Sequence, residues 1–372
     1  MHHRLPLSCL LVKPAGSECN LHCTYCFYKP DRSPAAFGQR MSLATLELMV
    51  RQALGRGSGP VSFIWQGGEP TVMALDFYRK AVELQTVHGR GRQVVNSLQT
   101  NGLLVDDAWC AFFQENGFLV GLSLDGPEHV HDRYRRTASG QGSWRLVARA
   151  ARKLLDAGVM VNAVSCVTEY SAAYARETYA SLKSEGFTYM QFIPVIEPDE
   201  TGQAAAFSVS PERYGAFLCE LFDLWLADFQ EGNPTTSIRL FESIFFLLLG
   251  QPAPECGFMK SCGTYLVVEH QGDVYPCDFF VSPNHRLGNL RETDLEELFN
   301  GARQRLFGQA KARLDTECLH CQWLPLCRGG CLKDRRNNPE GFQKQYFCPS
   351  MRQFLEHAVP VLRELAARWS PA

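Results

Sequence analysis

The 372-residue sequence lacks an excess of charge of either sign, because 37 Lys and Arg residues oppose 39 Asp and Glu residues, for a formal net charge of −2. This balance gives no electrostatic case for a nucleic-acid or membrane partner. The sequence also lacks long hydrophobic runs: residues 244–249 are far short of the roughly 18 residues of a membrane span. Residues 5–12 are too short for a secretory signal and predict a first strand. We therefore expect a cytoplasmic protein with no nucleic-acid or membrane partner.

Cysteine, in contrast, is abundant, with 15 residues. Disulfides explain this number poorly in a chain without a predicted secretory signal. Four cysteines are scattered singly through apolar or helical stretches and are predicted to be buried small hydrophobes: Cys9, Cys110, Cys166 and Cys219. The other eleven form one group near the N-terminus and a second group between residues 256 and 348.

The N-terminal group, Cys19, Cys23 and Cys26, has the spacing C-x3-C-x2-C and offers three thiolates. A [4Fe–4S] cluster held by three cysteines keeps one iron free for another molecule, whereas a structural zinc site takes four protein ligands. Half of a zinc site and a redox dithiol are the alternatives, and the spacing suits neither well. The motif therefore predicts a cluster with an open iron.

The second group contains eight cysteines, which divide into two sites of four. It includes C-x2-C-x5-C-x3-C from Cys318 to Cys331, preceded by C-x14-C and followed by Cys348. The same spacings also fit a zinc ribbon. With the N-terminal motif present, fully ligated iron–sulfur clusters are the favoured interpretation, and spacing alone leaves the division of the eight ligands open.

Strands and helices are predicted to alternate over the first half of the chain. The predicted strands are 7–12, 61–65, 94–98, 118–124, 159–167 and 189–193, and the predicted helices are 42–54, 75–87, 106–116, 143–157 and 174–185. Six strands joined by helices imply a parallel sheet with right-handed crossovers, open or closed into a barrel. Ligands should gather at the C-terminal ends of these strands.

Polar motifs follow several of these strand ends. Gly67-Gly68-Glu69-Pro70 comes after the second strand, where glycines allow close approach to a ligand and Glu69 or backbone carbonyls can accept hydrogen bonds from an amino group. An ordinary turn is the alternative. Ser123, Asp125 and Arg135 lie at or beyond the fourth strand and are predicted to bind the same ligand, with turn and capping chemistry as their alternative.

The three-cysteine motif, with Tyr25 before its last cysteine, resembles the signature of the radical S-adenosylmethionine (SAM) superfamily. The eight later cysteines resemble the SPASM extension of some of these enzymes. From residue 5 to the helix after Cys348, the sequence closely resembles the anaerobic sulfatase-maturating enzymes. Four segments carry this resemblance: Lys13-Pro14, S-L-Q-T-N-G at 97–102, G-L-S-L-D-G-P at 121–127 and Y-P-C-D-F-F at 275–280. One departure is Phe280, where relatives often carry tyrosine.

The resemblance implies an α/β fold in which a partial (β/α)6 radical SAM barrel (1–235) precedes a helical connection (236–255), a cysteine-rich SPASM domain (256–348) and a C-terminal helix (349–372). It implies three [4Fe–4S] clusters: one that binds SAM, on Cys19, Cys23 and Cys26; auxiliary cluster I, on Cys256, Cys262, Cys277 and Cys331; and auxiliary cluster II, on Cys318, Cys321, Cys327 and Cys348. The implied SAM-binding residues are Tyr25, Gln66, Gly67, Gly68, Glu69, Gln99, Asn101, Ser123, Asp125, Arg135 and Ile196.

The implied reaction oxidises an active-site Cys or Ser of a sulfatase to Cα-formylglycine. SAM is cleaved to methionine and a 5′-deoxyadenosyl radical, which takes a hydrogen atom from the substrate Cβ. Asp278, adjacent to Cys277, resembles the general base of the family, and a turn cap is its alternative role. The auxiliary clusters offer a route for the leaving electron.

The implied partners are an unfolded or nascent sulfatase chain with a C-x-P-x-R or S-x-P-x-R motif, and an electron donor such as flavodoxin or ferredoxin. One alternative is another SPASM peptide maturase that forms thioether or carbon–carbon crosslinks. Such enzymes often carry an N-terminal peptide-recognition domain, for which a motif beginning at Cys19 leaves no room. The second alternative is a zinc-binding interaction module, which would be colourless rather than brown. The sequence leaves the choice between Cys and Ser substrates open.

Overall fold

The structure, a computed structural model, describes residues 4–28, 38–336 and 344–369. The chain folds into two compact units, each built from segments that are distant in sequence. The first unit consists of Met1–Ser123, Arg135–Val161 and Gly263–Gly308, and the second of Leu124–Tyr134, Asn162–Cys262 and Gln309–Ala372.

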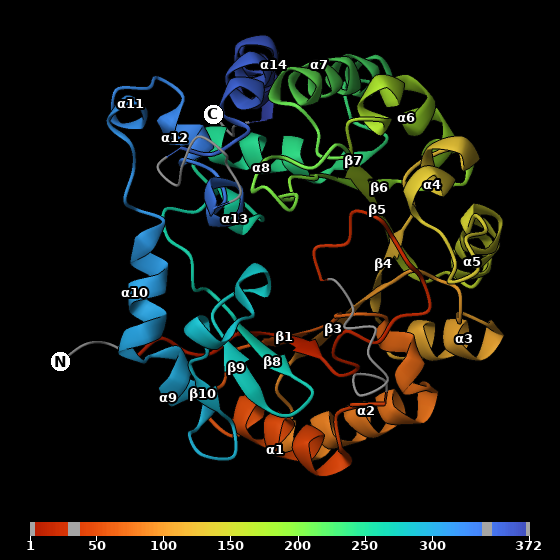
Figure 1. The fold of residues 1–372 in the computed structure, drawn as a ribbon, viewed down its shortest axis with the longest axis vertical. Helices are drawn as coiled ribbons and strands as arrows, with labels where there is room; N and C mark the ends of the chain where they lie inside the picture. The colour runs from red at the N-terminus through yellow and green to blue at the C-terminus, as the bar shows by residue number, and fades with distance from the viewer. Residues whose placement is uncertain (1–3, 29–37, 337–343, 370–372) are drawn as a thin grey trace. The chain divides into compact units, whose positions relative to one another are not determined.

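The first unit contains a seven-stranded run of sheet in the order β10-β9-β8-β1-β2-β3-β4 (Figure 1). Strands β8, β1, β2, β3 and β4 are parallel, and β9 and β10 are antiparallel to their neighbours. In the register, Leu11 of β1 is paired with Ile64 and Val267. The bounds are β1 Cys9–Lys13, β2 Val61–Trp65, β3 Val94–Thr100, β4 Leu119–Ser123, β8 Leu266–Glu269, β9 Asp273–Tyr275 and β10 Gly288–Asn289.

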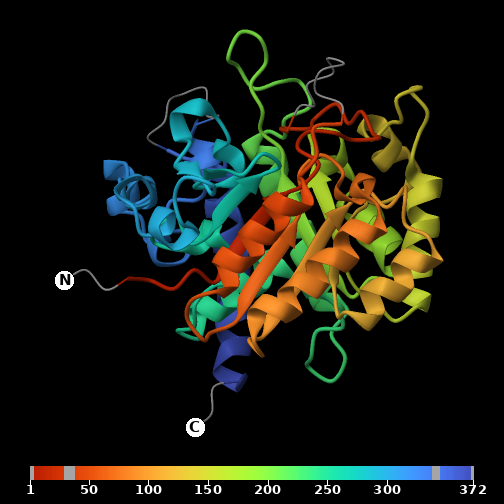
Figure 2. The same cartoon turned by 90° about the horizontal axis from the view of Figure 1, so that it is seen from below.

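Helices of the first unit connect the parallel strands. Helices α1 and α2 lie next to each other along the outside of β1 to β3 (Figure 1), and the turned view shows both in front of these strands (Figure 2). Side-chain caps fix two helix starts, because Ser42 accepts from Thr45 N at 3.1 Å and Asp106 from Trp109 N at 3.0 Å. The helices, including 3-10 turns marked η, are α1 Leu43–Leu54, η1 Pro70–Met73, α2 Leu75–Gly89, α3 Asp107–Glu115, α5 Trp144–Asp156, η4 Asp278–Phe280, η5 Pro283–His285, α9 Leu295–Phe299 and α10 Ala302–Ala310.

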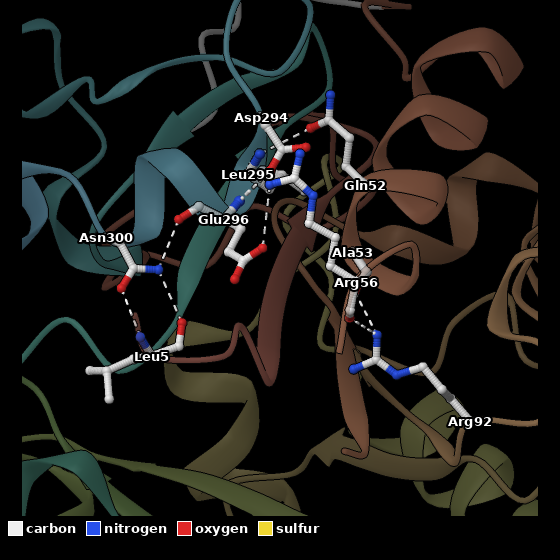
Figure 3. Close-up of polar contacts among 9 residues, drawn as sticks. All are labelled: Leu5, Gln52, Ala53, Arg56, Arg92, Asp294, Leu295, Glu296 and Asn300. Carbon is white, nitrogen blue, oxygen red and sulfur yellow. Dashed lines mark hydrogen bonds and ion pairs between the residues drawn. The ribbon is translucent and has the colours of Figure 1, made fainter. Parts of the chain in front are cut away.

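Polar contacts attach the late segment of this unit to its N-terminal part (Figure 3). Gln52 of α1 accepts from Leu295 N at 3.1 Å and donates to Leu290 O at 2.8 Å. Asn300 bonds both backbone groups of Leu5, at 2.9 and 3.0 Å. These contacts hold the segment of residues 290–300 against α1 and the N-terminal strand segment, while β8 lies beside β1 through direct strand pairing.

The second unit contains the parallel strands β5, β6 and β7. Its longest helices, α7 and α14, pack through aromatic side chains, with the Phe222 and Phe354 rings 6.0 Å apart. The bounds are α4 Glu128–Tyr134, β5 Met160–Val167, η2 Ser171–Tyr174, α6 Ala175–Ser184, β6 Tyr189–Pro194, α7 Pro211–Ala227, β7 Ser237–Ile238, α8 Arg239–Leu248, η3 Cys256–Phe258, α11 Thr316–Leu319, α12 Leu324–Cys327, α13 Leu332–Arg336 and α14 Cys348–Trp369.

The alternating pattern predicted from the sequence is confirmed. All six predicted strands and all five predicted helices are present, with ends displaced by no more than two residues. The predicted C-terminal helix corresponds to α14, and its residues 370–372 lie outside the described part of the chain. No described helix has the length and apolar character needed to cross a bilayer.

Of the four scattered cysteines, only Cys110 is fully buried, as predicted. Cys9, Cys166 and Cys219 are partly buried, so the prediction of full burial is wrong for these three.

Candidate functional site

The loop after β1 carries Cys19, Cys23 and Cys26, all partly buried. Cys26 N donates to Cys23 O at 3.3 Å, which folds the end of the motif into a turn. Burial, with the nearby Glu69 carboxylate as a second cause and the other two cysteines as weaker ones, raises the pKa of the Cys19 thiol to about 12. A thiolate here therefore requires a nearby positive charge, and iron bound by the three sulfurs would supply it.

This loop is bonded to the Gly67-Gly68 turn after β2. Gly68 N donates to Gly16 O at 2.8 Å, and Glu69 N to Glu18 O at 2.7 Å. A Cβ atom on Gly68 would lie 2.1 Å from Glu18 O, so no larger residue fits without moving the loop. The sequence predicted that these glycines allow a ligand to approach; the structure shows in addition that they allow the cysteine loop to approach.

Glu69 is almost fully buried and links the ends of β2 and β3. Its Oε1 atom accepts from Thr71 N and Oγ1 at 3.0 and 2.6 Å and from Thr100 Oγ1 at 2.7 Å, and its Oε2 atom accepts from Asn101 N at 2.7 Å. Burial raises the pKa of Glu69, and these hydrogen bonds oppose the shift. One carboxylate oxygen is thus occupied by the protein, and Oε2 retains capacity for a further donor.

The ends of β3 and β4 place more of the predicted residues nearby. Asn101 Nδ2 donates to Asn20 Oδ1 at 2.6 Å and lies 3.8 Å from Cys19 Sγ. Gln99 Nε2 donates to Ser123 Oγ at 3.1 Å. The structure therefore joins the cysteine loop to Asn101 at the end of β3, and joins the ends of β3 and β4 through Gln99 and Ser123.

Asp278 lies at the start of η4 and is held by two side chains from the strand ends. Lys13 Nζ lies 2.6 Å from Asp278 Oδ1, and Gln66 Nε2 donates to Asp278 Oδ2 at 2.5 Å. The Lys13 ammonium also lies 3.5 Å from the ring centre of Tyr28, whose hydroxyl donates to Glu269. Gln66, predicted to bind SAM, thus contacts the predicted base.

Lys13, Tyr28 and Glu269 were not predicted as site residues. Lys13 stood next to Pro14 in a motif used for the resemblance, but no role was assigned to it. A lysine at the end of the strand C-L-L-V-K, inside an otherwise apolar run, was the available signal.

Tyr25 and Arg135 contact each other. The Arg135 guanidinium lies 5.4 Å from the Tyr25 ring centre, and Arg135 is 7% exposed. This places Arg135 against the cysteine loop.

Two predicted SAM-binding residues belong to the second unit. Asp125 Oδ1 accepts from Cys166 N of β5 at 2.8 Å, and Asp125 N donates to His131 Nδ1 at 3.3 Å, so the Asp125 carboxylate is held by a strand rather than by a turn of its own segment. Ile196 O accepts from Lys333 Nζ at 2.7 Å, and Lys333 also pairs with Glu197 at 2.9 Å.

Four of the later cysteines line one pocket of the second unit: Cys318, Cys321, Cys327 and Cys348. Trp323, Met351 and Leu355 are among its apolar walls. Gln345 Nε2 lies 3.3 Å from Cys327 Sγ and donates to it. The donor set and the apolar walls fit an iron–sulfur cluster.

Three further cysteines, Cys256, Cys262 and Cys331, belong to the second unit, and the carbonyl group of Cys256 accepts from the buried Lys311 Nζ at 2.9 Å. Cys277 belongs to the first unit, where Tyr265 Oη donates to its sulfur at 3.4 Å. Over residues 4–28, 38–336 and 344–369, no three His, Cys, Asp or Glu side chains converge closely enough to bind a single metal ion.

Comparison with protein families gives two matches. Residues 14–172 match the radical SAM superfamily, and residues 256–322 match SPASM, an iron–sulfur cluster-binding domain. The three-cysteine loop lies in the first match, and five of the eight later cysteines lie in the second.

Among similar proteins, the cysteine-type anaerobic sulfatase-maturating enzyme of Clostridium perfringens is 39% identical over 97% of this chain and 98% of its own length. The serine-type enzyme of Bacteroides thetaiotaomicron is 36% identical over 98% of this chain and 93% of its own.

Comparison with solved structures also finds proteins that are similar over almost the whole chain. Native anSMEcpe with bound AdoMet has a TM-score of 0.89 and 37% identity, covering 96% of this chain and 99% of that chain. Its complex with AdoMet and the Cp18Cys peptide also has a TM-score of 0.89, with 38% identity, 97% and 99% of the two chains being covered. Streptococcus suis SuiB bound to S-adenosylmethionine is similar in fold only, with a TM-score of 0.63 and 17% identity over 92% and 78% of the two chains.

Proposed function

The chain belongs to the anaerobic sulfatase-maturating enzymes, and we propose that it binds SAM and three [4Fe–4S] clusters with the residues described above. It is a radical SAM enzyme that oxidises an active-site Cys or Ser of a sulfatase to Cα-formylglycine. Its fold is α/β, with a radical SAM partial barrel followed by a SPASM domain. The observation that carries this function is the match of nearly the whole chain to both Cys-type and Ser-type members of the family.

We infer four parts of the chain. The SAM-binding barrel is assigned to 1–235, the helical connection to 236–255, the SPASM domain to 256–348 and the C-terminal helix to 349–372. Within the barrel, Cys19, Cys23 and Cys26 would hold the SAM-binding cluster. The carbonyl groups of the Gly67-Gly68 turn and the free capacity of Glu69 Oε2 would accept hydrogen bonds from the SAM amino group. The remaining contacts to SAM are assigned to Tyr25, Gln66, Gln99, Asn101, Ser123, Asp125, Arg135 and Ile196.

We infer that Cys318, Cys321, Cys327 and Cys348 hold auxiliary cluster II, because they line one pocket. Auxiliary cluster I is assigned to Cys256, Cys262, Cys277 and Cys331.

When bound, SAM and its cluster would supply a 5′-deoxyadenosyl radical able to remove a hydrogen atom from the substrate Cβ. The oxidation also requires loss of the side-chain proton and of one more electron, and the auxiliary clusters would accept this electron. With a Cys substrate, water would then replace the sulfur, which leaves as hydrogen sulfide. Asp278 accepts the proton of the substrate thiol or hydroxyl group, directly or through one water. Lys13 and Gln66 each hold one oxygen of its carboxylate, so that its position is fixed before the substrate arrives.

The proposed substrate is an unfolded or nascent sulfatase segment with a C-x-P-x-R or S-x-P-x-R motif. A flavodoxin or ferredoxin is the proposed electron donor. Free thiols and oxygen-sensitive clusters require a reducing compartment, and we therefore expect the enzyme to act in the cytoplasm.

The activity is tested by anaerobic incubation of the reconstituted enzyme with SAM, a reductant and matched peptides that carry Cys, Ser or Ala in the first motif position. Aldehyde formation, read by mass spectrometry after hydrazide labelling, is expected with Cys, Ser or both and absent with Ala. Formation of a crosslink without an aldehyde would instead indicate the other class of SPASM maturase.

The cluster assignment is tested by metal analysis of the same preparation. Three four-iron clusters predict about twelve irons per chain with little zinc. About two zinc ions with roughly four irons would assign the later cysteines to zinc.

A further inference from the structure

Two buried cations of the second unit, Lys311 and Arg335, form no ion pair with a carboxylate among residues 4–28, 38–336 and 344–369. Lys311 is 0% exposed and Arg335 is 1% exposed. Lys311 Nζ donates to the carbonyl groups of Cys256 at 2.9 Å and Gly257 at 2.6 Å. Arg335 donates only to carbonyl groups, those of Gly329 and Arg313. Carbonyl groups solvate a cation without neutralising it, and in the described part of the chain no carboxylate lies within ion-pair distance of either side chain.

Both cations lie against the cysteine sites. Lys311 Nζ bonds the carbonyl group of Cys256. The guanidinium group of Arg335 bonds Gly329, which lines the pocket of Cys318, Cys321, Cys327 and Cys348, and Arg335 N donates to Cys331 O at 3.2 Å. Burial lowers the pKa of both side chains. A buried charge without a counter-charge is strongly unfavourable. These side chains therefore require negative charge from the sulfur sites.

Arg335 is fixed in its position by the Gly329-Gly330 segment between Cys327 and Cys331. Arg335 Nε and Nη2 both donate to Gly329 O, at 3.0 and 2.9 Å. Gly329 has a φ of +74°, and a Cβ there would lie 2.5 Å from Arg335 Nη2. Gly329 also lines the four-cysteine pocket. The glycine thus makes room for a guanidinium group beside that pocket.

We propose that Lys311 and Arg335 are the fixed counter-charges of the auxiliary clusters. Lys311 serves the site of Cys256, Cys262 and Cys331, and Arg335 serves both this site and the pocket of Cys318, Cys321, Cys327 and Cys348. The inference rests on the proposed function, because it requires clusters at these cysteines.

The consequence is a raised reduction potential. A [4Fe–4S] cluster with four thiolates carries a net charge of about −2 when oxidised and about −3 when reduced by one electron. A fixed buried cation stabilises the more negative state more strongly. Oxidation of the substrate releases one electron besides the hydrogen atom and the proton, and a raised potential favours its uptake. Gln345 acts in the same direction through its hydrogen bond to Cys327.

The test is a redox titration of the reconstituted enzyme, followed by electron paramagnetic resonance. The Cys19→Ala, Cys23→Ala, Cys26→Ala background leaves only auxiliary signals. In this background, Lys311→Met should lower the midpoint of one cluster and Arg335→Met the midpoints of both. We expect a change of about tenfold in the ratio of reduced to oxidised cluster at a fixed potential, which is 59 mV for one electron. Lys311→Arg keeps the charge and should keep the midpoint.

Lys183→Met is the control, because Lys183 belongs to the same unit but is paired with Asp228. Unchanged midpoints in both Met variants at full iron content would overturn the inference. If a Met variant loses iron, the rate at which a chelator removes iron from the protein is measured instead. Iron that is retained in Lys311→Arg but lost in Lys311→Met supports the counter-charge role. Equal iron loss in the two variants overturns the inference. Failure of the parent enzyme to bind auxiliary iron would overturn the proposed function itself.

Discussion

Lys13 Nζ lies 2.6 Å from Asp278 Oδ1, and the exposed fractions of the two side chains are 0% and 9%. The pair joins the end of β1 to the turn that follows β9, so the proposed base is attached to the strand that leads into the cysteine loop. Gln66 holds the second oxygen of the carboxylate. A base held in this way loses little freedom when substrate binds.

Replacing Asp278 with Asn should separate SAM cleavage from aldehyde formation. SAM cleavage in the presence of peptide should continue, whereas aldehyde formation should fall by about 100-fold or more, because a general base usually contributes at least this factor. Quantifying 5′-deoxyadenosine and aldehyde in the same reactions gives both rates. An Asn variant with full iron content that still forms formylglycine at near the parental rate would exclude the base assignment.

The same substitution should also lower stability, because it leaves the buried Lys13 ammonium without its partner. Breaking a buried pair from one side costs about 3–5 kcal/mol. Adding Lys13→Met to Asp278→Asn should recover most of the thermal midpoint without recovering aldehyde formation. A double variant as unstable as Asp278→Asn would show that the ion pair is not the source of the loss.

Replacing Cys19, Cys23 and Cys26 with Ala should abolish 5′-deoxyadenosine formation. The later cysteines are untouched, so iron should fall from about twelve to about eight atoms per chain rather than to zero. Iron analysis and chromatography of the nucleoside products measure the two quantities. SAM cleavage that survives in this variant would contradict the assignment of the open cluster.

Replacing Gly68 with Ala should displace the cysteine loop, since the new Cβ would lie 2.1 Å from Glu18 O. Loss of the SAM-binding cluster, seen as a decrease of about four irons per chain, is the expected result. Gly59→Ala is the matched control, because nothing lies within 4 Å of its Cβ position. Equal iron content in both variants would show that the turn does not support the loop.

Glu69 should make stability fall as the pH rises. Its pKa in the folded protein is raised above the ordinary 4.5 by burial, so folding favours the protonated form. The corresponding stabilisation is complete below pH 4.5 and is lost as the pH rises through the folded-state value. Thermal midpoints of the parent and of Glu69→Gln, measured between pH 5 and 8, should therefore diverge, with the parent declining more steeply. Parallel curves would contradict the raised pKa.

The periodicity of the first half of the chain was sufficient to predict its strands and helices, because each strand is a short apolar run between clear turn signals. The cysteine spacing likewise predicted the three-cysteine loop, whereas the grouping of Cys318, Cys321, Cys327 and Cys348 came from the family resemblance, because spacing leaves the division of the eight later cysteines open. The Lys13–Asp278 pair was not predictable, since more than 260 residues separate its members and only the pairing of β1 with β8 brings them together. Spacing also gave no signal for Lys311 or Arg335, because their burial beside the cysteine sites becomes visible only in the folded chain.

The Gly67-Gly68 turn is joined to the cysteine loop through two backbone hydrogen bonds and a contact that tolerates no side chain. Neither segment can therefore be transplanted alone. A designer who grafts the three-cysteine loop onto another α/β scaffold must also transfer the turn from the neighbouring strand. In natural divergence, insertions in one segment would have to be matched by compensating changes in the other.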